Sequence, residues 1–252
     1  MPGPHQRYDR ASIGRLRMDR EKRMERVRAN FAAGSNDYDD RIRKIVPRYD
    51  EMLCALVGSA ALKEGEALRA LDIGCGTGAA SSLLLKAHPK IELTCLDMTE
   101  SMLDLARRRL ADQDARFVLA DVHDFEPDGP YDAVISSLAL HHVVTDADKR
   151  TLYRKIFSAL APGGSFYNAD IVLGSDDSIQ EIYMMRWKEH MYRSFSAEEV
   201  DVVNVPRYLR EDNPSKLMDH LRWLEEAGFE AVDVIWKHYN FAVYGGKKRA
   251  VP

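Results

Sequence analysis

The run Gly74–Gly78, with the sequence GCGTG, directly follows an apolar stretch and precedes a segment with helical spacing. A glycine turn between a strand and a helix lets the backbone approach a ligand closely, and the helix N-terminus offers unpaired N–H groups. This arrangement predicts a site for a nucleotide-like cofactor. On its own it leaves the cofactor open, because Gly74, Gly76 and Ala79 also satisfy the dinucleotide fingerprint.

Three acidic residues, Asp72, Asp97 and Asp121, stand where neighbouring strands of a parallel sheet are expected to end. A carboxylate after the second strand suits a ribose diol, and one after the third can accept a hydrogen bond from an adenine amine. Together the acids repel a pyrophosphate and attract a cation. They therefore favour S-adenosylmethionine, which carries a sulfonium and an ammonium, over NAD. The alternative interpretation of each acid alone is a helix cap or a turn residue.

Two adjacent histidines, His141 and His142, follow the fourth expected strand, and Asp170 lies near the end of the fifth. These residues are the candidates for a general base, which is needed only if an acceptor arrives protonated. The alternative is that one or both histidines simply pack beside the cofactor. The chain has eight histidines, and their spacing relative to cysteines and acids indicates no metal site.

Short apolar runs separated by helical stretches are typical of a parallel sheet with crossover helices. The expected strands cover residues 68–73, 92–96, 115–119, 133–137, 165–171, 231–236 and 239–243. The expected helices among them cover residues 79–87, 101–111, 146–160, 176–193 and 214–227. The segment 162–164, Pro-Gly-Gly, should stop the third of these helices. The last two strands are joined so tightly that they must pair antiparallel. The fold class is α/β, a Rossmann-like doubly wound and mostly parallel sheet.

Two helices are expected before the first strand, a mostly polar one over residues 13–31 and an amphipathic one over 39–61 with a kink at Pro47. We expect residues 1–64 to form an N-terminal helical extension or lid. Residues 65–252 would form the cofactor-binding domain, with a helical cover inserted at about residues 174–213.

Size and composition favour a soluble enzyme. The chain has 252 residues, of which 45% are hydrophobic and 30% are charged. No apolar window is long enough to span a membrane, and the N-terminus has no apolar signal core, so we expect a cytoplasmic protein. Three scattered cysteines are too few for a disulfide framework or a zinc site.

The net charge of −4 is unevenly distributed. Residues 1–30 contain nine Lys or Arg and four Asp or Glu. This basic arm could contact RNA or an acidic ligand. The interpretation that we favour is a solvated helix, because Glu21 and Glu25 alternate with the basic residues at helical spacing.

From about Leu68 to Gly246 the chain resembles the class I S-adenosylmethionine-dependent methyltransferases. The segment 71–78, with the sequence LDIGCGTG, is similar to the first motif of that family, and Asp97, Asp121 and residues 162–164 match later ones. The resemblance implies a seven-stranded sheet whose last strand inserts antiparallel, and S-adenosyl-L-methionine as cofactor.

The resemblance also implies roles for individual residues. Gly74, Gly76 and Gly78 would hold the methionine part of the cofactor, and Ser137 would lie near it. Asp97 would bind the ribose, and Met98 would flank the adenine ring. Asp121 and the Val122 N–H would bind the adenine amine. Asp72, Cys75 and Met102 complete the predicted cofactor site.

A closer similarity, to the carboxy-S-adenosylmethionine synthase branch, rests on residues 38–49 and on Trp187, Lys188 and the segment 227–229. In that branch the tyrosine after Val-Pro-x lies against the cofactor, which points to Tyr49. A nearby arginine reads the added carboxylate, and Arg207 is the candidate here. The glycine loop of this chain keeps the ordinary methyltransferase form instead.

The acceptor pocket is expected to form from segments outside the repeating pattern. Its candidate residues are Arg43, Tyr183, Trp187 and Arg207. Aromatic residues and methionines at helical spacing are more often part of a core. The helix at 176–193 nevertheless follows the fifth strand, where a cover over the substrate is common in such enzymes.

These observations predict a methyltransferase that acts on a small-molecule acceptor by in-line methyl transfer. One alternative keeps the cofactor and changes the reaction, to carboxy-S-adenosylmethionine synthesis or to cyclisation of the aminobutyrate chain. Another is a tRNA-modifying methyltransferase that uses the basic arm. A second copy of the chain, forming a homodimer, is a further possible partner.

Overall fold

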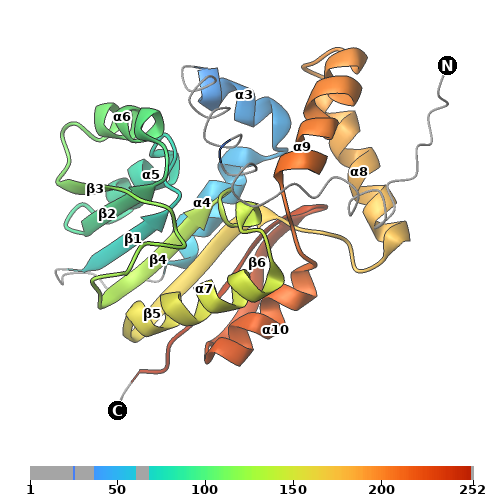
Figure 1. The fold of residues 1–252 in the computed structure, drawn as a ribbon. Helices are drawn as coiled ribbons and strands as arrows, with labels where there is room; N and C mark the ends of the chain where they lie inside the picture. Colours follow the sequence, from blue (N-terminus) through green and yellow to red (C-terminus); the bar gives the residue numbers. More distant parts are fainter. Residues whose placement is uncertain (1–24, 26–36, 61–67, 251–252) are drawn as a thin grey trace.

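A seven-stranded sheet organises the molecule, with the strand order β3-β2-β1-β4-β5-β7-β6 in the computed structural model (Figure 1). The structure describes residue 25 and residues 37–60 and 68–250. The predicted helix over residues 13–31 and the basic arm therefore lie outside the described residues, apart from residue 25. The strands are β1 (Arg69–Ile73), β2 (Glu92–Asp97), β3 (Ala115–Leu119), β4 (Tyr131–Ser137), β5 (Leu160–Ile171), β6 (Glu230–His238) and β7 (Phe241–Lys247).

The last strand runs against its neighbours. The pairs β1–β2, β1–β4, β2–β3 and β4–β5 are parallel, whereas β7 pairs antiparallel with both β5 and β6. The predicted α/β fold with an antiparallel last strand is therefore confirmed. The central strands are buried on both faces, as the near-continuous apolar run of β4 required.

Helices cover both faces of the sheet. They are α3 (Tyr38–Ile45), α4 (Tyr49–Ser59), α5 (Ala79–Ala87), α6 (Glu100–Arg109), α7 (Asp146–Ala159), α8 (Asp177–Met191), α9 (Val205–Glu211) and α10 (Leu217–Ala227), with short turns η2 (Leu140–His142) and η3 (Glu199–Asn204). One cluster of buried side chains joins α4, α5, α6 and α8 to one face, and a second joins α7 and α10 to the other. Figure 1 shows α7 and α10 on the side of the sheet opposite to α4.

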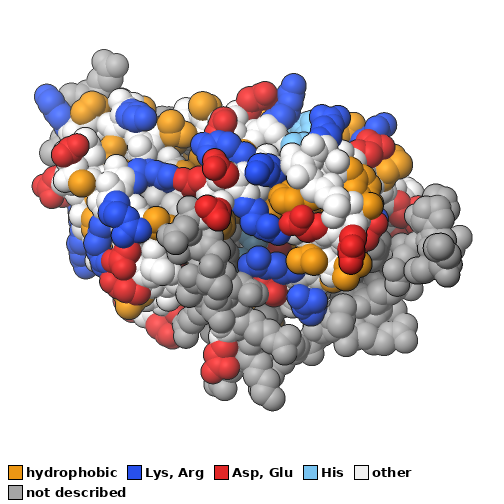
Figure 2. Space-filling view, turned by 90° about the horizontal axis from the view of Figure 1, so that it is seen from above, with side chains coloured by type: hydrophobic (Ala, Val, Ile, Leu, Met, Phe, Trp, Pro, Cys, Tyr) orange, Lys and Arg blue, Asp and Glu red, His pale blue; other side chains and the backbone are white. Residues whose placement is uncertain are grey.

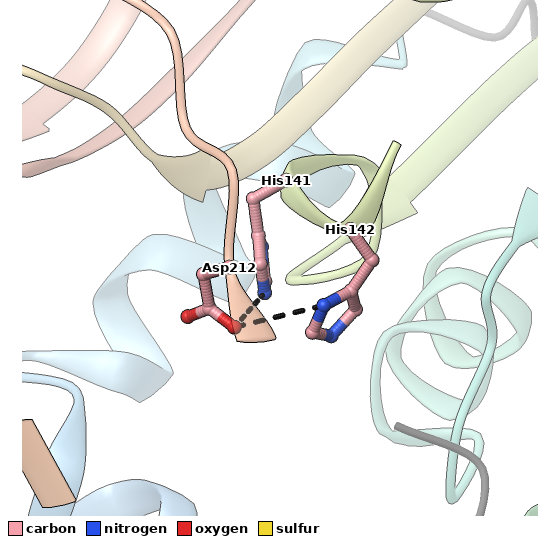
Figure 3. Close-up of side chains that lie close together, drawn as sticks. All are labelled: His141, His142 and Asp212. Carbon is pink, nitrogen blue, oxygen red and sulfur yellow. Dashed lines mark ion pairs between the residues drawn. The ribbon is translucent and has the colours of Figure 1, made fainter. Parts of the chain in front are cut away.

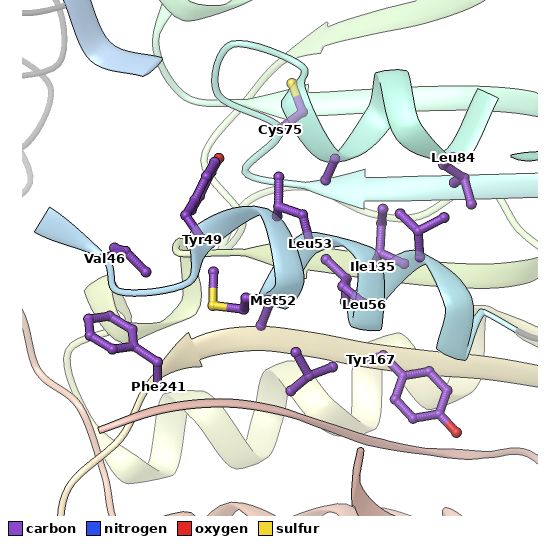
Figure 4. Close-up of a cluster of buried hydrophobic side chains, with 14 of the residues drawn as sticks. Val46, Tyr49, Met52, Leu53, Leu56, Cys75, Leu84, Ile135, Tyr167 and Phe241 are labelled. Carbon is purple, nitrogen blue, oxygen red and sulfur yellow. The ribbon is translucent and has the colours of Figure 1, made fainter. Parts of the chain in front are cut away.

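Helix α4 crosses the centre of the first cluster. Its apolar side chains at helical spacing, Tyr49, Met52, Leu53 and Leu56, are all buried (Figure 4). Burial of each such side chain contributes about 1.5–3 kcal/mol to the free energy of unfolding. Helix α4, which lies within the predicted N-terminal extension, therefore forms part of the core.

The prediction of one kinked helix over residues 39–61 was wrong, because the chain breaks into α3 and α4. Pro47 lies in the break, and Arg48 adopts a left-handed conformation with φ of 57°. The indole N–H of Trp187 donates a hydrogen bond of 2.7 Å to the carbonyl oxygen of Ile45, at the end of α3. The break lets α3 turn away from the core and lie over the carboxyl ends of the strands.

The stop after α7 also differs from the prediction. The helix ends at Ala159, and β5 begins at once, so the Pro-Gly-Gly segment 162–164 lies within the strand rather than before it. The register with β4 shifts between Tyr131 and Ala133, which accommodates the extra residues as a bulge.

The segment that follows β5 is helical. It contains α8, η3 and α9, within the predicted cover at about residues 174–213. None of the described helices has the length and apolar character needed to cross a bilayer.

Candidate cofactor and acceptor site

The glycine loop joins β1 to α5 at the carboxyl edge of the sheet. Gly74 and Gly76 both have positive φ angles, of 70° and 54°. A Cβ atom at Gly74 would lie 2.3 Å from the Cβ of Ala139, so the loop packs directly against the turn after β4. A Cβ at Gly76 would meet nothing within 4 Å, which leaves the backbone there facing open space.

That open space is a cavity, called here the first cavity, of about 920 Å³ including the part open to solvent. It lies at the carboxyl ends of β1, β2 and β4, where open α/β sheets bind ligands. Most of the predicted cofactor residues line it. They are Tyr49, Gly74, Cys75, Gly76, Asp97, Met98, Met102, Asp121, Val122 and Ser137.

The Asp97 carboxylate in this lining is anchored by backbone hydrogen bonds. Its two carboxylate oxygens accept hydrogen bonds from the backbone N–H of Gly76, at 2.9 Å, and of Thr99, at 2.8 Å. Burial raises the pKa of Asp97, while these backbone hydrogen bonds oppose the rise. A carboxylate has about four acceptor positions, so both oxygens keep capacity for hydroxyl groups of a ligand.

Asp72 and Gly78 do not line the first cavity. The Asp72 side chain points with Ala70 toward the face of the sheet that α4 and α5 cover, because side chains alternate along a strand. It is fully buried and accepts a hydrogen bond of 2.6 Å from the Ser81 hydroxyl. Burial raises its pKa to about 7. Two carboxylates rather than three therefore face the first cavity, and Gly78 caps α5 instead.

A second cavity adjoins the first. It has a volume of about 970 Å³ including its open part, and its lining comes from α3, α8, α9 and the turn η2. Three residues, Tyr38, Leu138 and His142, line both cavities. Ligands in the two cavities would therefore meet at these side chains.

A cluster of ionisable groups stands at this junction (Figure 3). The Nε2 atom of His141 lies 3.7 Å from Oδ1 of Asp212, and the Nδ1 atom of His142 lies 3.6 Å from the same oxygen. On its other side, Nδ1 of His141 lies 2.5 Å from Oδ1 of Asp170. Burial alone would lower the pKa of His141, but the Asp170 and Asp212 carboxylates together raise it.

Asp170 lines neither cavity and is buried behind His141. Its carboxylate also accepts hydrogen bonds from the backbone N–H of His141, at 3.0 Å, and of Ile171, at 2.9 Å. In the structure it therefore orients His141 and lies away from the space that an acceptor could occupy.

Asp212 was missed in the sequence analysis. It lies 70 residues beyond His142 in the sequence, just after α9, and neither its spacing nor its neighbours mark it. The backbone N–H of Asn213 donates to the carbonyl oxygen of His141 at 2.8 Å, which brings Asp212 beside the two histidines. Tyr38, at the start of α3, was also missed, because only the fold carries α3 over the junction.

The predicted acceptor residues divide into two groups. Trp187 and Arg207 line the second cavity. Arg43 does not, because its guanidinium pairs with Asp50 on the exposed side of α3 and α4. Tyr183 does not either, because its ring packs against Tyr239 and its hydroxyl accepts a hydrogen bond of 2.6 Å from Lys237.

Comparison with known proteins identifies the domain. A family model described as a methyltransferase domain matches residues 70–164, from β1 into β5. The chain contains a class I S-adenosylmethionine-dependent methyltransferase domain. Around this domain, the chain is 29% identical over 219 residues to carboxy-S-adenosyl-L-methionine synthase of Campylobacter hominis, a match that covers 84% of this chain and 90% of that relative.

Two further similarities are informative. The chain is 28% identical over 141 residues to malonyl-[acyl-carrier protein] O-methyltransferase 1 of Ilyobacter polytropus, which covers 56% of this chain and only half of that relative. The solved DhpI-SAM-HEP complex superimposes with a TM-score of 0.61 at 23% identity and covers 88% of this chain and 96% of that one. This structural likeness supports the methyltransferase fold.

The first cavity of the methyltransferase domain fits S-adenosylmethionine. Its lining holds the carboxylates of Asp97 and Asp121, and among the residues described there it holds neither Lys nor Arg. A pyrophosphate would find no cationic side chain in this lining, whereas a sulfonium compound needs none. The open backbone at Gly76 leaves room for a ligand to lie directly on the loop.

Proposed function

We propose that the protein transfers a methyl group from S-adenosylmethionine to a small-molecule acceptor held in the second cavity. The observation that carries this proposal is the shared wall of the two cavities. Tyr38, Leu138 and His142 line both, so a cofactor in one and an acceptor in the other would approach each other there.

In this proposal the first cavity holds the cofactor. Asp97 accepts hydrogen bonds from the ribose hydroxyls, Asp121 and the Val122 N–H contact the adenine amine, and the loop at Gly74 and Gly76 holds the methionine part. Support comes from the position of all five residues in one lining and from the anchored carboxylate of Asp97.

When bound, S-adenosylmethionine supplies a methyl group bonded to a sulfonium sulfur, and the sulfur side of the molecule is the leaving group. The chain contributes alignment and exclusion of water, and positioning of two reactants is worth up to about 7–11 kcal/mol. Helix α3 covers the junction and is tied to the glycine loop, since the Thr77 hydroxyl donates to Asp39 at 2.7 Å and Arg109 donates to both residues.

His142 is the side chain that we place against the reacting atom of the acceptor. It lines both cavities and is 13% exposed, so it can contact a ligand without facing bulk solvent. His141 and Asp170 act behind it, as a pair that fixes the turn η2. This assignment keeps His142 as the catalytic candidate and gives His141 and Asp170 positioning roles.

The second cavity suits a polar acceptor. Arg41 and Arg207 line it together with Glu211 and Asp212, so both signs of charge are present. The Nε of Arg207 donates to Glu211 at 3.0 Å, which fixes the guanidinium at the cavity wall. An acceptor with a carboxylate or hydroxyl group would find charge-assisted partners here.

Calorimetry with S-adenosylhomocysteine tests the cofactor assignment. The demethylated product should bind to the wild-type protein, whereas NAD should not. Transfer is then followed by mass spectrometry of candidate acids and alcohols incubated with the protein and labelled cofactor. A protein that binds neither S-adenosylmethionine nor S-adenosylhomocysteine would refute the proposal.

A second candidate is synthesis of carboxy-S-adenosylmethionine. It is favoured by the coverage of 84% of this chain in the match to the synthase from Campylobacter hominis. It is also favoured by the positions of Tyr49 in the first cavity and Arg207 in the second. Mass spectrometry of the cofactor recovered from the purified protein separates the two. A carboxylated or cyclised cofactor would support non-methyl-transfer chemistry, and a methylated acceptor would support methyl transfer.

A tRNA acceptor remains the third candidate and depends on residues 1–30. On the described part of the face above the cavities, Lys and Arg side chains are interspersed with Asp and Glu (Figure 2). Such a surface gives little steering of a polyanion. RNA binding that falls steeply with salt and is lost on deletion of residues 1–30 would favour this candidate.

A further inference from the structure

We infer that His141, His142 and Asp212 form a binding site for one divalent transition-metal ion at the junction of the two cavities. The ion site itself follows from the geometry of the three side chains. Its use in activating an acceptor rests on the proposed function.

The distances among the three ligand atoms fit a metal better than they fit direct hydrogen bonds. Nε2 of His141, Nδ1 of His142 and a carboxylate oxygen of Asp212 all lie within 4.8 Å of one another. The two nitrogen-to-oxygen distances, 3.7 and 3.6 Å, exceed the usual length of an N–H···O hydrogen bond. Two ligands at about 2.0–2.1 Å from a tetrahedral ion lie roughly 3.4 Å apart. An ion between the three groups therefore requires only small movements.

His141 is oriented as a metal ligand. Its Nδ1 faces the Asp170 carboxylate at 2.5 Å, and its Nε2 is directed toward Asp212. With Nδ1–H donating to Asp170, Nε2 would offer its lone pair to an ion once its own proton is displaced. Asp170 is itself held by the Asn168 amide at 3.2 Å and by two backbone N–H groups. A carboxylate that fixes a ligating histidine from behind is the usual outer partner of a metal site.

The backbone next to Asp212 is held by a separate set of contacts. The neighbouring residue Asn213 bonds through its N–H to His141 and through its side-chain amide to the carbonyl oxygen of Val144. The buried amine of Lys149 donates to the carbonyl oxygen of Asn213 and, at 2.7 Å, to the hydroxyl of Ser215. The backbone that carries Asp212 is therefore fixed beside the turn that carries the two histidines.

The charge and chemistry of the ligands select the class of ion. Two imidazoles and one carboxylate suit Zn²⁺, Fe²⁺ or Co²⁺, whereas Mg²⁺ and Ca²⁺ prefer oxygen ligands alone. The charges that act most strongly on His141 are the carboxylates of Asp170 and Asp212 and the ammonium of Lys149. The second cavity adds Arg41, Arg207 and Glu211, so the positive side chains named here are matched by an equal number of carboxylates.

All three ligands line the second cavity, so an ion there keeps coordination positions open toward an acceptor. A bound ion lowers the pKa of a coordinated hydroxyl and orients its oxygen. In the metal-loaded protein His142 would be a ligand, and the proton of the acceptor would leave to solvent when its oxygen coordinates. The acceptor would be an alcohol, phenol or carboxylic acid. Its oxygen would form a bond to the methyl carbon while the bond from that carbon to the sulfonium sulfur breaks and S-adenosylhomocysteine leaves.

Cobalt titration tests the site directly. The protein is stripped with a chelator and titrated with CoCl₂ alone, because four-coordinate Co²⁺ with nitrogen ligands absorbs strongly in the visible range. We expect one Co²⁺ per chain for the wild type and for the control His238→Gln, which changes a histidine of β6 outside both cavities. Asp212→Asn and His142→Gln should each weaken binding at least tenfold.

Parallel titration with S-adenosylhomocysteine separates this inference from the proposed function. Asp212 does not line the first cavity, so Asp212→Asn should keep its affinity for this ligand and thereby report an intact fold. Wild-type protein that takes up no Co²⁺, or Asp212→Asn that binds Co²⁺ as the wild type does, would overturn the metal site even if methyl transfer is observed. If both variants fail to fold, X-ray absorption of the zinc-loaded wild type decides, since fewer than two imidazole ligands would refute the assignment.

Discussion

The Nδ1 atom of His141 and the Oδ1 atom of Asp170 lie 2.5 Å apart in the interior, although 29 residues separate them in the sequence. His141 belongs to the turn after β4, and Asp170 lies near the end of the neighbouring strand β5. The pair therefore links the two strands whose carboxyl ends flank the junction of the cavities. The strength of the His141–Asp170 interaction therefore determines how firmly the turn η2 is fixed to β5.

Asp170→Asn should destabilise the protein by about 3 kcal/mol, because it removes one partner of a buried ion pair. The raised pKa of His141 favours the folded state below the ordinary histidine pKa of about 6.5, and this contribution is lost as the pH rises through the raised value. The lowered pKa of Asp170 contributes above about pH 4 and is lost as the pH falls. Urea unfolding of both proteins should show the largest difference between about pH 4 and 6.5. A difference that grows above this window would contradict the pairing.

Asp72 changes the stability with pH in the direction opposite to that of Asp170. Burial raises its pKa from 3.8 to about 7, so the folded chain holds this proton more tightly than the unfolded chain does. The free energy of unfolding should fall through this group by about 4 kcal/mol as the pH rises from about 4 to 7, and then level off. Asp72→Asn should lack this part of the pH dependence. The measurement is urea unfolding of both proteins across this range, and identical pH profiles would refute the prediction.

Gly76→Val should abolish binding of S-adenosylhomocysteine, because the new side chain would fill the open space over the loop. The backbone at φ 54° adds a cost of about 1–2 kcal/mol in stability, too little to unfold most domains. Gly58→Val is the matched control, since a Cβ there also meets nothing within 4 Å but lies on the exposed side of α4. Calorimetry on both variants tests the prediction. Unchanged affinity for Gly76→Val would mean that the ligand lies elsewhere.

Asp97→Asn should weaken binding of S-adenosylhomocysteine by about 1–3 kcal/mol through loss of charge-assisted hydrogen bonds. The amide group cannot accept from both the Gly76 and the Thr99 N–H groups, so the loop also loses an anchor. Asp104→Asn, on the exposed side of α6, removes the same charge away from the cavity and should bind normally. Equal losses in the two variants would point to a general charge effect instead.

Lys149→Met should reduce stability by about 2 kcal/mol and also weaken Co²⁺ binding, because the segment after Asp212 loses its buried donor. Lys155→Met is the control. Lys155 lies on the same helix and donates to the carbonyl oxygens of His123 and Phe125, away from the histidine cluster. Its replacement should lower stability without changing the Co²⁺ titration. If both variants bind Co²⁺ as the wild type does, Lys149 has no positioning role.

The sequence was sufficient for the parts of the site that follow directly from strand order. Once Asp97 and Asp121 are placed at the ends of neighbouring parallel strands, their meeting at one edge of the sheet is a geometric necessity. The direction of the Asp72 side chain could not be predicted from strand order. Whether a carboxylate at the end of a strand faces a cavity or the core depends on the pleat, which a shift of one residue reverses.

Contacts made by irregular segments could not be predicted. Asp212 reaches His142 only because η3, α9 and the loop after them return across the sheet edge, and no periodicity encodes that path. Pro47 indicated a break between α3 and α4. The size of the break depends on the left-handed conformation of Arg48, which cannot be predicted from the residue type because arginine has no preference for that conformation. Both features concern the acceptor side, which explains why that side was the harder one to predict.

Tyr38, Leu138 and His142 belong to the walls of both cavities. Any adjustment that one occupant imposes on these three side chains alters the affinity for the other, and reciprocity requires the two free-energy changes to be equal. Binding in the two cavities is therefore expected to be cooperative through these three shared side chains. An acceptor that strengthened retention of the spent nucleoside would slow its own turnover, since product release would then become the slow step.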